Sequence, residues 1–365
     1  MSTTFDRRRL LLRPLSKRVN RVDVERDMIR PGDPTPSMSG HAAEQTLRVA
    51  EAVHRARAAG RPVIVAFGAH AIKNGLAPVL IELMTGGKIT HFATNGAGII
   101  HDWEIAFQGK TSESVRDNQE AGSFGLWDET GLYLNLAIAV GAYRGLGYGE
   151  SVGSLIAENG LVIPSTDELE HEIADRRTAV WKRAAAADLL DAIGRTGIGP
   201  GPLSVEHPYR GYSLQAAAYS AGVPLTGHPM IGHDIIYMHP VSSGAAIGRT
   251  AETDFLRFAD AVQLMSGGVY LSVGSAIMSP MVFEKSFSMA QNVARQSGTR
   301  IENHSIFVVD LAESSWNWST QGEPPTDDPA YYLRFLKSFA RVGATLEYIS
   351  ADNRAFFPAL HAALS

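Results

Sequence analysis

Short apolar runs alternate along this chain with longer segments in which apolar residues recur at helical spacing. The short runs are rich in valine, isoleucine and aromatic residues and mostly end in small or polar residues, as expected of strands that lead into turns. We predict strands at 61–69, 88–96, 223–228, 268–276, 304–312 and 345–352. We predict helices at 77–87, 99–109, 213–222, 250–265, 281–298, 328–343 and 354–364, the fourth of them capped by Thr250 or Thr253.

This order of elements predicts a doubly wound α/β fold with a mainly parallel sheet. Strands this apolar are buried on both faces, which is typical of parallel strands covered by helices. The stretch at about 129–198 lacks strand signals and indicates a helical insertion. We therefore expect an N-terminal arm and helix at 1–60 and a single α/β domain at 61–365. The polar segment 319–328 is a candidate lid.

Composition narrows the functional classes. The 365 residues carry a net charge of −5, which argues against a nucleic-acid surface. The absence of cysteine removes disulfides, thiolate metal sites and cysteine nucleophiles, and it fits a reducing compartment. No apolar run reaches the roughly 18 residues of a membrane helix, so we expect a soluble cytoplasmic protein. The basic opening at 7–18 indicates a solvated terminus, with an arm that contacts a neighbouring subunit as the alternative.

Small and polar residues follow most of the predicted strands, and Thr94 to Gly98 has the composition of a flexible, donor-rich turn. Because the carboxyl ends of parallel strands share one edge, these residues would gather where α/β folds bind ligands. Glycine lets the backbone approach a ligand, and the following helices offer free N–H groups. The pattern predicts an extended phosphate ligand such as a dinucleotide, with ordinary strand–helix turns as the alternative. The residues concerned are Gly68, Ala69, His70, Thr94, Asn95, Gly96, Ala97, Gly98, Gly227, His228, Gly274, Ser275, Ala276, Asp310, Ala351 and Asp352.

Two common nucleotide-binding motifs are missing from the sequence. There is no GxGxxG after the first strand and no GxxxxGK[ST] loop. These absences argue against an ordinary dinucleotide-binding dehydrogenase and a P-loop enzyme.

Histidines suggest another chemistry. His228, His233 and His239 lie near Asp234, and a metal-dependent hydrolase using His228, His233 and Asp234 is one alternative. No pair of them has the i, i+4 spacing of a helical metal site, so a catalytic or hydrogen-bonding role is favoured and we assign no metal. Histidines satisfied within the fold remain an equal alternative. Asp102 is expected near a helix start, where the helix dipole suits a carboxylate.

Several segments resemble deoxyhypusine synthase. The segment TNGAGIIHD at 94–102 is similar to that family's TTAGGVEED-type loop, and GHDIIYMHP at 232–240 resembles its GDMIFFH segment. Further matches follow in the family's order at 67–75, 268–276 and 349–364. The opening motif is also similar to GNAxAxHDxE…GTS in the related domain of archaeal-type ornithine cyclodeaminases. The matching places are Asn95, Gly96, His101, Asp102, Glu104, Gly109, Lys110, Thr111 and Ser112.

The resemblance implies a Rossmann-like domain that binds NAD, in a dimer or tetramer with sites near subunit interfaces. It places His101, Asp234 and Glu313 on the substrate side. His101 is the favoured general base, since histidine as a residue type titrates near neutral pH. By position, the cofactor contacts would be Gly68, Ala69, His70, Thr94, Asn95, Gly96, Gly274, Ser275 and Asp352.

The sequence departs from deoxyhypusine synthase at residues that carry its chemistry. The stretch 319–335 lacks the family's imine-forming lysine, and Met278 replaces one of its histidines. We therefore do not predict hypusine formation. The expectation is an NAD-dependent transferase, oxidoreductase or lyase acting on a small amine or amino acid, and the alternative is an inactive NAD-binding sensor or scaffold. Lys73 would be a phosphate partner, an imine-forming amine or a solvated lysine, and Trp316 and Trp318 would line the pocket or fill the core.

Overall fold

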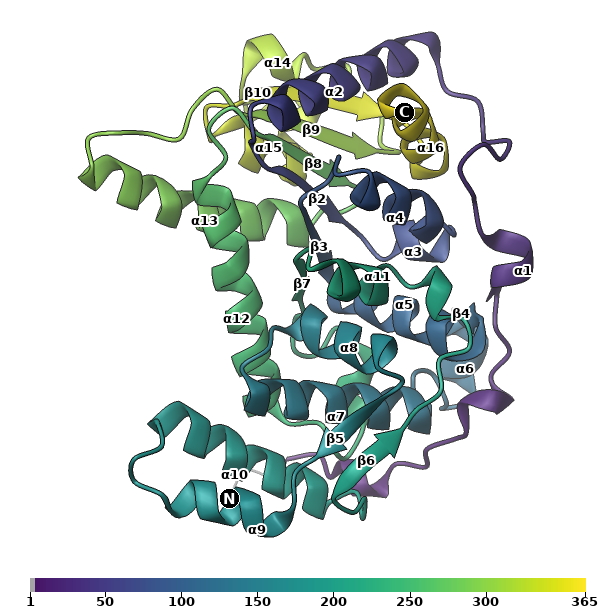
Figure 1. The fold of residues 1–365 in the computed structure, drawn as a ribbon. Coiled ribbons are helices and arrows are strands. Elements are labelled where there is room, and N and C mark those ends of the chain that lie inside the picture. Colours follow the sequence, from purple (N-terminus) through teal and green to yellow (C-terminus); the bar gives the residue numbers. More distant parts are fainter. Residues whose placement is uncertain (1–3) are drawn as a thin grey trace.

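A six-stranded parallel sheet forms the centre of the molecule (Figure 1). The computed structural model describes residues 4–365, apart from the Arg334 side chain. Across the sheet the strands follow the order β7-β3-β2-β8-β9-β10. Within this sheet the chain forms β2 first and then adds β3 and β7 on one side of it. It then returns to the other side of β2 and adds β8, β9 and β10. The strand bounds are β2 Val63–Phe67, β3 His91–Asn95, β7 Leu225–His228, β8 Val269–Val273, β9 Ser305–Asp310 and β10 Thr345–Ser350.

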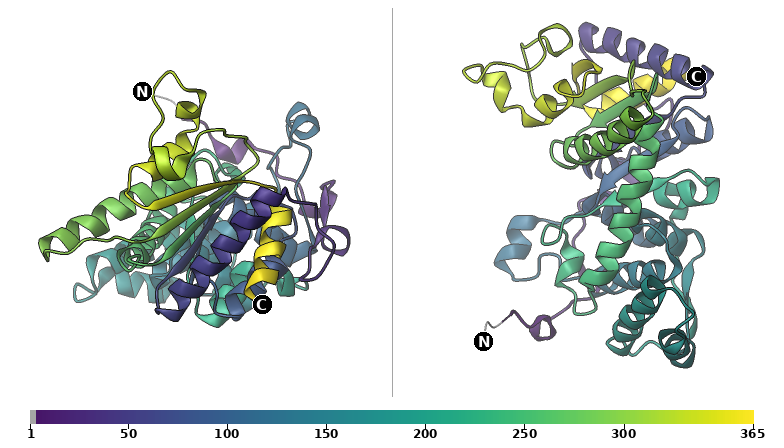
Figure 2. Two further views of the ribbon diagram at one scale, coloured as in Figure 1. Left: turned by 90° about the horizontal axis from the view of Figure 1, so that it is seen from above. Right: turned by 90° about the vertical axis from the view of Figure 1, so that its left-hand side faces the viewer.

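Helices cover both faces of this sheet, as the apolar strands predict. Along β2, Val63, Val65 and Phe67 point to one helical layer, whereas Ile64 and Ala66 belong to a separate core on the other face. Figure 2 shows the two layers on opposite sides of the sheet. The first layer contains α2 (Gly40–Ala58), α4 (Ala77–Thr85) and α16 (Asn353–Leu364), and the second contains α12 (Gly244–Gln263), α13 (Met278–Gln296) and α15 (Arg334–Ala340). The predicted doubly wound α/β fold is therefore confirmed.

A mainly helical segment separates β3 from β7 and forms the lower half of Figure 1. The segment also contains an antiparallel ribbon, β5 with β6, that the sequence analysis did not predict. Glycine and proline in the second strand of that ribbon hide its strand signal. The elements are α5 (Gly96–Gln108), β4 (Lys110–Thr111), α6 (Val115–Glu120), α7 (Asp128–Arg144), α8 (Tyr148–Ala157), β5 (Gly160–Ile163), α9 (Thr166–Ala174), α10 (Val180–Gly194), β6 (Gly201–Ser204), η3 (Arg210–Tyr212) and α11 (Leu214–Ala221).

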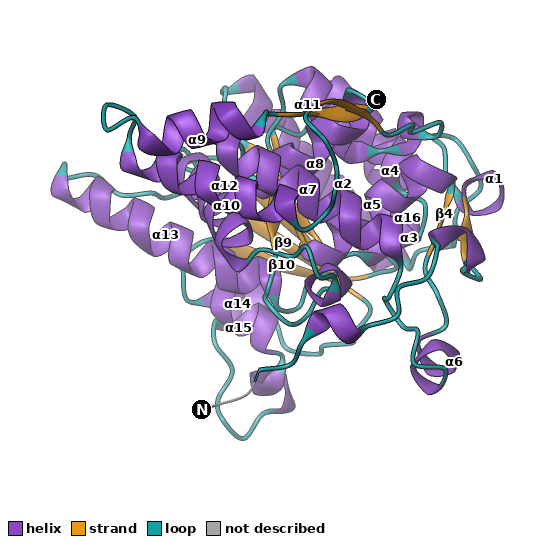
Figure 3. Cartoon of the chain, turned by 90° about the horizontal axis from the view of Figure 1, so that it is seen from below, coloured by secondary structure: helices purple, strands orange, loops and turns teal. Residues whose placement is uncertain are grey.

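The N-terminal segment starts beside the lower helices and runs along one side of the molecule up to α2 (Figure 1). Its elements are η1 (Arg7–Arg9), η2 (Leu15–Lys17), β1 (Val22–Asp23) and α1 (Val24–Asp27). Figure 3 shows α6 and α13 projecting from the body. The remaining short elements are α3 (His70–Lys73), η4 (Ile235–Met238), α14 (Trp318–Gln321) and η5 (Pro329–Tyr332). Within 4–365, no helix combines the length and the apolar character that crossing a bilayer requires.

The start of α12 differs from the prediction. Ser243 caps this helix by accepting a hydrogen bond from the Ala246 N–H at 3.3 Å. Thr250 and Thr253 lie inside the helix, where their hydroxyls donate to carbonyls one turn earlier. The predicted cap at Thr250 or Thr253 is therefore wrong. Buried Ala246 and Ile247 extend the helix upstream of the sequence signal.

The direction of strand order reverses between β2 and β8, and the turns after these two strands touch. The Gly68 N–H donates to the Val273 carbonyl at 3.2 Å. A Cβ at Gly68 would fall 2.1 Å from the Gly274 carbonyl oxygen. This approach of two backbones requires glycine at position 68.

We predict that Gly68→Ala destabilises the protein more than Gly274→Ala does. At Gly68 the new methyl group meets backbone, so the cost should be about 3 kcal/mol. At Gly274 there is open space, and only the left-handed φ of +56° penalises alanine, by about 1 kcal/mol. Urea unfolding of both variants measures the difference, and equal losses would contradict the tight contact between the turns.

Candidate active site

The segment Thr94 to Gly98 is the end of β3 and the first turn of α5. The buried Thr94 hydroxyl donates to the Phe67 carbonyl at 2.9 Å, and the Asn95 side chain caps α5 by accepting from the Gly98 N–H at 2.9 Å. The expected flexible turn is therefore wrong, because helix geometry begins at Gly96. The roles of Thr94 and Asn95 as cofactor contacts stay predictions, and both side chains already have partners within the fold.

Gly96 makes room for the Asp234 carboxylate. A Cβ at Gly96 would fall 2.2 Å from Asp234 Oδ2. The carboxylate therefore lies over the first turn of α5, where the helix dipole favours negative charge. Burial raises the pKa of Asp234 to about 6, and the Tyr237 hydroxyl donates to Oδ2 at 3.1 Å.

The other predicted cofactor contacts lie at the carboxyl edge of the sheet, which we call the rim. They differ in how far their polar groups are free to bind a ligand. Ser275 is buried, and its hydroxyl accepts a hydrogen bond from the Ser279 N–H at 3.2 Å. Asp352 caps α16 and pairs with Arg354 at 2.9 Å. Gly274 faces open space, and His70 is exposed. A hydrogen bond of 2.8 Å between Asn74 and Asn353 joins the segment after α3 to the start of α16.

A cavity of about 190 Å³ lies beside this rim, and we call it the α5 cavity. It brings together three of the four predicted catalytic residues, His101, Asp234 and Lys73. The described lining contains two cationic and three acidic side chains besides two histidines. The lining residues are Arg18, Lys73, Ala97, Ile100, His101, Glu104, Ser112, Glu113, Val115, Phe124, His233, Asp234 and Ile235.

A buried ion pair forms part of this lining. The Arg18 guanidinium donates to both oxygens of Glu104, at 2.6 and 2.7 Å, and both side chains are almost fully buried. Burial alone would raise the pKa of Glu104, but the Arg18 charge and the hydrogen bonds hold it below its usual value. Glu104 is therefore an ionised acceptor within the protein.

Arg18 reaches the cavity because the N-terminal segment pairs with the strand after α5. β1 and β4 form a short antiparallel ladder in which Val22 lies opposite Thr111. The Arg21 N–H also donates to the Ser112 carbonyl at 2.9 Å. The expected solvated terminus is thus wrong at Arg18, and also at Arg7, whose guanidinium donates to the carbonyls of Tyr237 and Ser242. Sequence reasoning missed Arg18 because nothing local to the basic run indicates its partner.

His101 is linked to the ion pair through Thr111. The distance from His101 Nδ1 to Thr111 Oγ1 is 2.7 Å, and the Thr111 hydroxyl donates to Glu104 Oε2 at 2.5 Å. Glu104 and Thr111 both fall in the segment that resembles the ornithine cyclodeaminase motif, and this resemblance is the signal that points to them. Ser112, which follows Thr111, lines the cavity with a φ of +68°, an uncommon conformation for a residue other than glycine.

Lys73 and Glu113 lie on the same cavity. Burial, followed by the nearby charge of Arg21, lowers the pKa of Lys73. Lys73 is half-buried and lines this cavity, which disfavours the interpretation as a solvated surface lysine. Burial raises the pKa of Glu113, which accepts hydrogen bonds from the Trp127 indole and the Gly125 N–H. Glu113 is not among the site residues that the sequence predicts.

Glu313 and the two nearby tryptophans lie apart from the α5 cavity. Glu313 is exposed in the segment after β9, outside the described lining, and its substrate role stays a prediction. Trp318 is buried in the core on the α12–α13 face, where Trp316 also packs. The core interpretation of these tryptophans is therefore the one that the structure favours.

The histidines of the 228–239 segment do not form a metal site. His228 is buried, its Nε2 lies 3.0 Å from the Thr226 hydroxyl, and its ring packs against Phe258. His239 Nε2 lies 3.2 Å from Asp128, whereas His233 is exposed. Among residues 4–365, no three side chains of the metal-binding types converge. The arrangement gives no support to the metal-dependent hydrolase.

Asp102 has a different structural role from the predicted one. It lies well inside α5 and caps α11 instead, accepting hydrogen bonds from the Leu214 and Gln215 N–H groups and the Ser213 hydroxyl. Burial is the main cause that raises the pKa of Asp102. Asp102 therefore does lie at the start of a helix, but that helix is α11 and not α5, to which it belongs.

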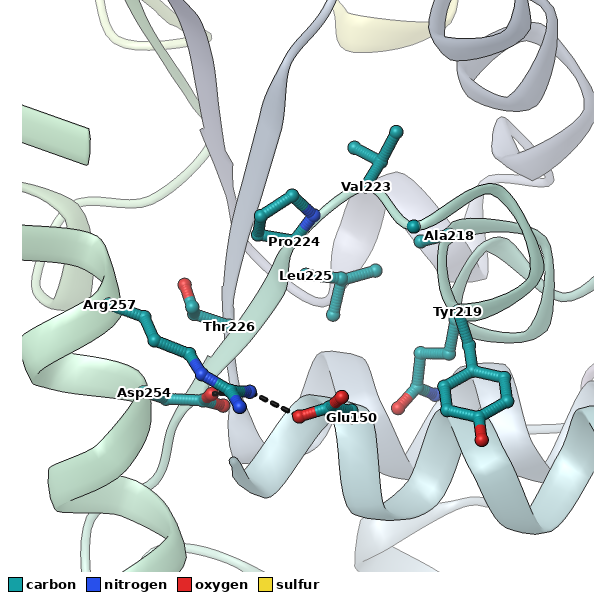
Figure 4. A pocket seen from close by; sticks show the side chains of 11 residues that line it. Glu150, Ala218, Tyr219, Val223, Pro224, Leu225, Thr226, Asp254 and Arg257 are labelled. Carbon is teal, nitrogen blue, oxygen red and sulfur yellow. Dashed lines mark hydrogen bonds and ion pairs between the residues drawn. The ribbon is translucent and has the colours of Figure 1, made fainter. Parts of the chain in front are cut away.

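A second cavity, of about 210 Å³, lies against the edge strand β7, away from the carboxyl rim (Figure 4). Arg257 and Glu150, which both line this cavity, form an ion pair. Beside them, buried Asp254 accepts hydrogen bonds from the N–H groups of Gly149 and Gly227. Asp254 thereby provides a hydrogen-bond partner for the Gly227 N–H at the outer edge of β7, which is a structural role. The described lining of this second cavity shares no residue with the predicted site.

Comparisons with known proteins give no family assignment. No family model matches the chain, and no curated protein matches it. Similar solved structures include the ternary complex of AgrE with ornithine and NAD+, at 12% identity and a TM-score of 0.43 over 90% of this chain and 34% of that one. ArgZ, an arginine dihydrolase from the ornithine–ammonia cycle in cyanobacteria, has 13% identity and a TM-score of 0.41, with 88% and 32% covered.

A LOR/SDH protein from Methanococcus maripaludis S2 has 12% identity and a TM-score of 0.42, over 92% of this chain and 73% of that one. This chain spans about a third of the length of AgrE and ArgZ. None of these matches is a deoxyhypusine synthase.

We predict that Arg18→Met lowers the free energy of unfolding by about 3–5 kcal/mol at neutral pH, because it leaves the Glu104 carboxylate buried without its cation. Wild-type Glu104 contributes stability above its usual pKa of 4.5 and loses that contribution as the pH falls toward its lowered value. In the variant, burial raises the pKa, so the penalty grows as the pH rises. The deficit relative to wild type should therefore shrink between pH 7 and pH 4.

Urea unfolding at the two pH values measures this change. Arg13→Met is the matched control, because Arg13 lies in the same segment with an exposed side chain. A variant at Arg18 that is as stable as the control at pH 7 would contradict the buried pair.

Proposed function

We propose that this protein binds NAD at the carboxyl edge of its sheet and is an enzyme acting on a small amine or amino acid held in the α5 cavity. The observation that carries the proposal is the reversal of strand order between β2 and β8, where two glycine turns meet. Doubly wound sheets bind dinucleotides at this reversal, outside the carboxyl ends of the strands. Relationship to deoxyhypusine synthase and assembly as a dimer or tetramer stay predictions from the sequence resemblance.

The residues around the reversal fit a dinucleotide. Gly274 has open space where a side chain would stand, so its backbone is free to meet a ligand closely. Gly68, Ala69 and His70 on one strand and Gly274 and Ser275 on the next would hold the cofactor. When bound, NAD supplies reversible oxidation of a C–H bond beside nitrogen or oxygen.

The α5 cavity adjoins this edge and suits a small charged substrate. α3, which follows the Gly68 turn, packs against α5, which carries His101. Asp234 and Glu113 would bind an ammonium group, and Lys73 would bind a carboxylate. His101 would accept the proton that leaves the substrate nitrogen or oxygen as the neighbouring C–H bond is oxidised. An opposite-charge pair on one small cavity favours a zwitterion such as an amino acid.

We predict that calorimetry detects NAD binding, and that diamines or amino acids then produce the near-ultraviolet absorbance of reduced nicotinamide. His101→Gln should lower the turnover by about 10²–10⁴-fold, because it removes the base. NAD binding should be retained, because the turns after β2 and β8 stay unchanged. The matched control is His54→Gln, an exposed histidine on α2.

No heat with either redox form would contradict the cofactor assignment. Binding without turnover on any amine or amino acid would favour the sensor. Turnover that survives His101→Gln would exclude His101 as the base.

A further inference from the structure

The hydrogen bonds that Glu104 accepts determine where the protons of its neighbours lie. An ionised carboxylate only accepts hydrogen bonds, and this one is held ionised by Arg18. Besides the two bonds from Arg18, it receives the Thr111 hydroxyl at 2.5 Å and the Thr130 hydroxyl at 3.2 Å. Since Thr111 has a single hydroxyl proton, that proton is committed to Glu104.

The commitment of this proton leaves only one role for Thr111 toward His101. Its oxygen lies 2.7 Å from His101 Nδ1 and accepts a hydrogen bond there, so Nδ1 carries the proton. A neutral imidazole has one N–H, and Nε2 is then the atom with the lone pair. The His101 side chain is 20% exposed and lines the α5 cavity, and no hydrogen bond in the described chain uses Nε2.

We propose that Thr111 is a positioning residue which, through Glu104 and Arg18, fixes neutral His101 as the Nδ1–H tautomer and presents Nε2 to the substrate as a base. The base role rests on the proposed function, whereas the tautomer follows from the hydrogen bonds alone. The second nitrogen of a catalytic histidine commonly has its proton placed by such a partner. In water, an imidazole side chain favours the other tautomer, so the protein has to impose this one.

The opposite tautomer would break the chain of hydrogen bonds. With the proton on Nε2, the Nδ1 lone pair would face Thr111, whose hydroxyl would have to turn away from a buried carboxylate. A hydrogen bond to a charged, buried group is among the stronger ones in proteins, so its loss biases the tautomers by at least about ten-fold. Arg18 belongs to the N-terminal segment, which is therefore part of the active-site machinery and not only a surface arm.

Selective ¹⁵N labelling of histidine tests the tautomer directly. Long-range proton–nitrogen NMR correlations distinguish Nδ1–H from Nε2–H, and His101→Gln identifies the signals of His101. In the wild-type protein without cofactor, we expect the Nδ1–H form of the neutral His101 imidazole to exceed the Nε2–H form by about ten-fold or more. Thr111→Val should shift the population toward Nε2–H, and Thr111→Ser should restore the wild-type pattern.

Thr130→Val is the matched control. It removes another hydroxyl from Glu104 but not the bond to His101, so the tautomer should stay as in wild type. Wild-type protein with the proton on Nε2, or a Thr111→Val variant with an unchanged tautomer, would overturn the proposal. Should Thr111→Val fail to fold, the wild-type spectrum alone still shows which nitrogen carries the proton, and a proton on Nε2 would overturn the proposal.

Activity measurements separate this inference from the proposed function. With a substrate in hand, Thr111→Val should lower kcat by about 10–100-fold with little change in KM, and Thr111→Ser should recover most of it. If His101 is in the Nδ1–H form but no amine or amino acid is turned over, the role of Thr111 stands and the proposed enzymatic function is contradicted. If turnover occurs with His101 in the Nε2–H form, the enzymatic function stands and the role of Thr111 is refuted.

Discussion

The buried ion pair between Arg18 and Glu104 is the interaction on which the rest of the site depends. Two charges removed from water are stable only with close geometry and further hydrogen bonds. Here the pair has both, because Thr111 and Thr130 complete the acceptor capacity of the carboxylate. These contacts join the N-terminal segment, α5, β4 and α7 at one point. A shift in any of these segments would therefore reach His101 and the shape of the α5 cavity.

The sheet explains why this cavity lies beside a cofactor edge. β3 is the immediate neighbour of β2, with Phe67 opposite Thr94, so the carboxyl ends of the two strands lie about 5 Å apart, one strand spacing. Gly96 then lets Asp234 approach α5, and Gly68 lets the turns after β2 and β8 touch. Both glycines create close approaches at the same edge of the sheet. The α5 cavity thus lies beside the strand ends that carry the proposed cofactor groups.

The sequence predicted the sheet well because its strands are buried on both faces, where apolar runs such as 63–67 and 269–273 have few other interpretations. The motif near His101 also identified a real cluster. Two of the missed interactions share a physical cause, since each depends on a partner distant in sequence. Arg18 is 86 positions from Glu104, and Asp102 caps a helix more than 100 positions away. Hydroxyls inside α12 bond to their own helix, so Thr250 imitates a cap without being one.

The central claim, that the turns at the strand-order reversal hold the cofactor, is tested most directly by hydrogen-exchange mass spectrometry with and without NAD. The account predicts slower exchange in peptides covering 66–74 and 272–280, with smaller changes along the start of α5. Exchange unchanged in both turns, or protection confined to 215–226 beside the second cavity, would contradict it.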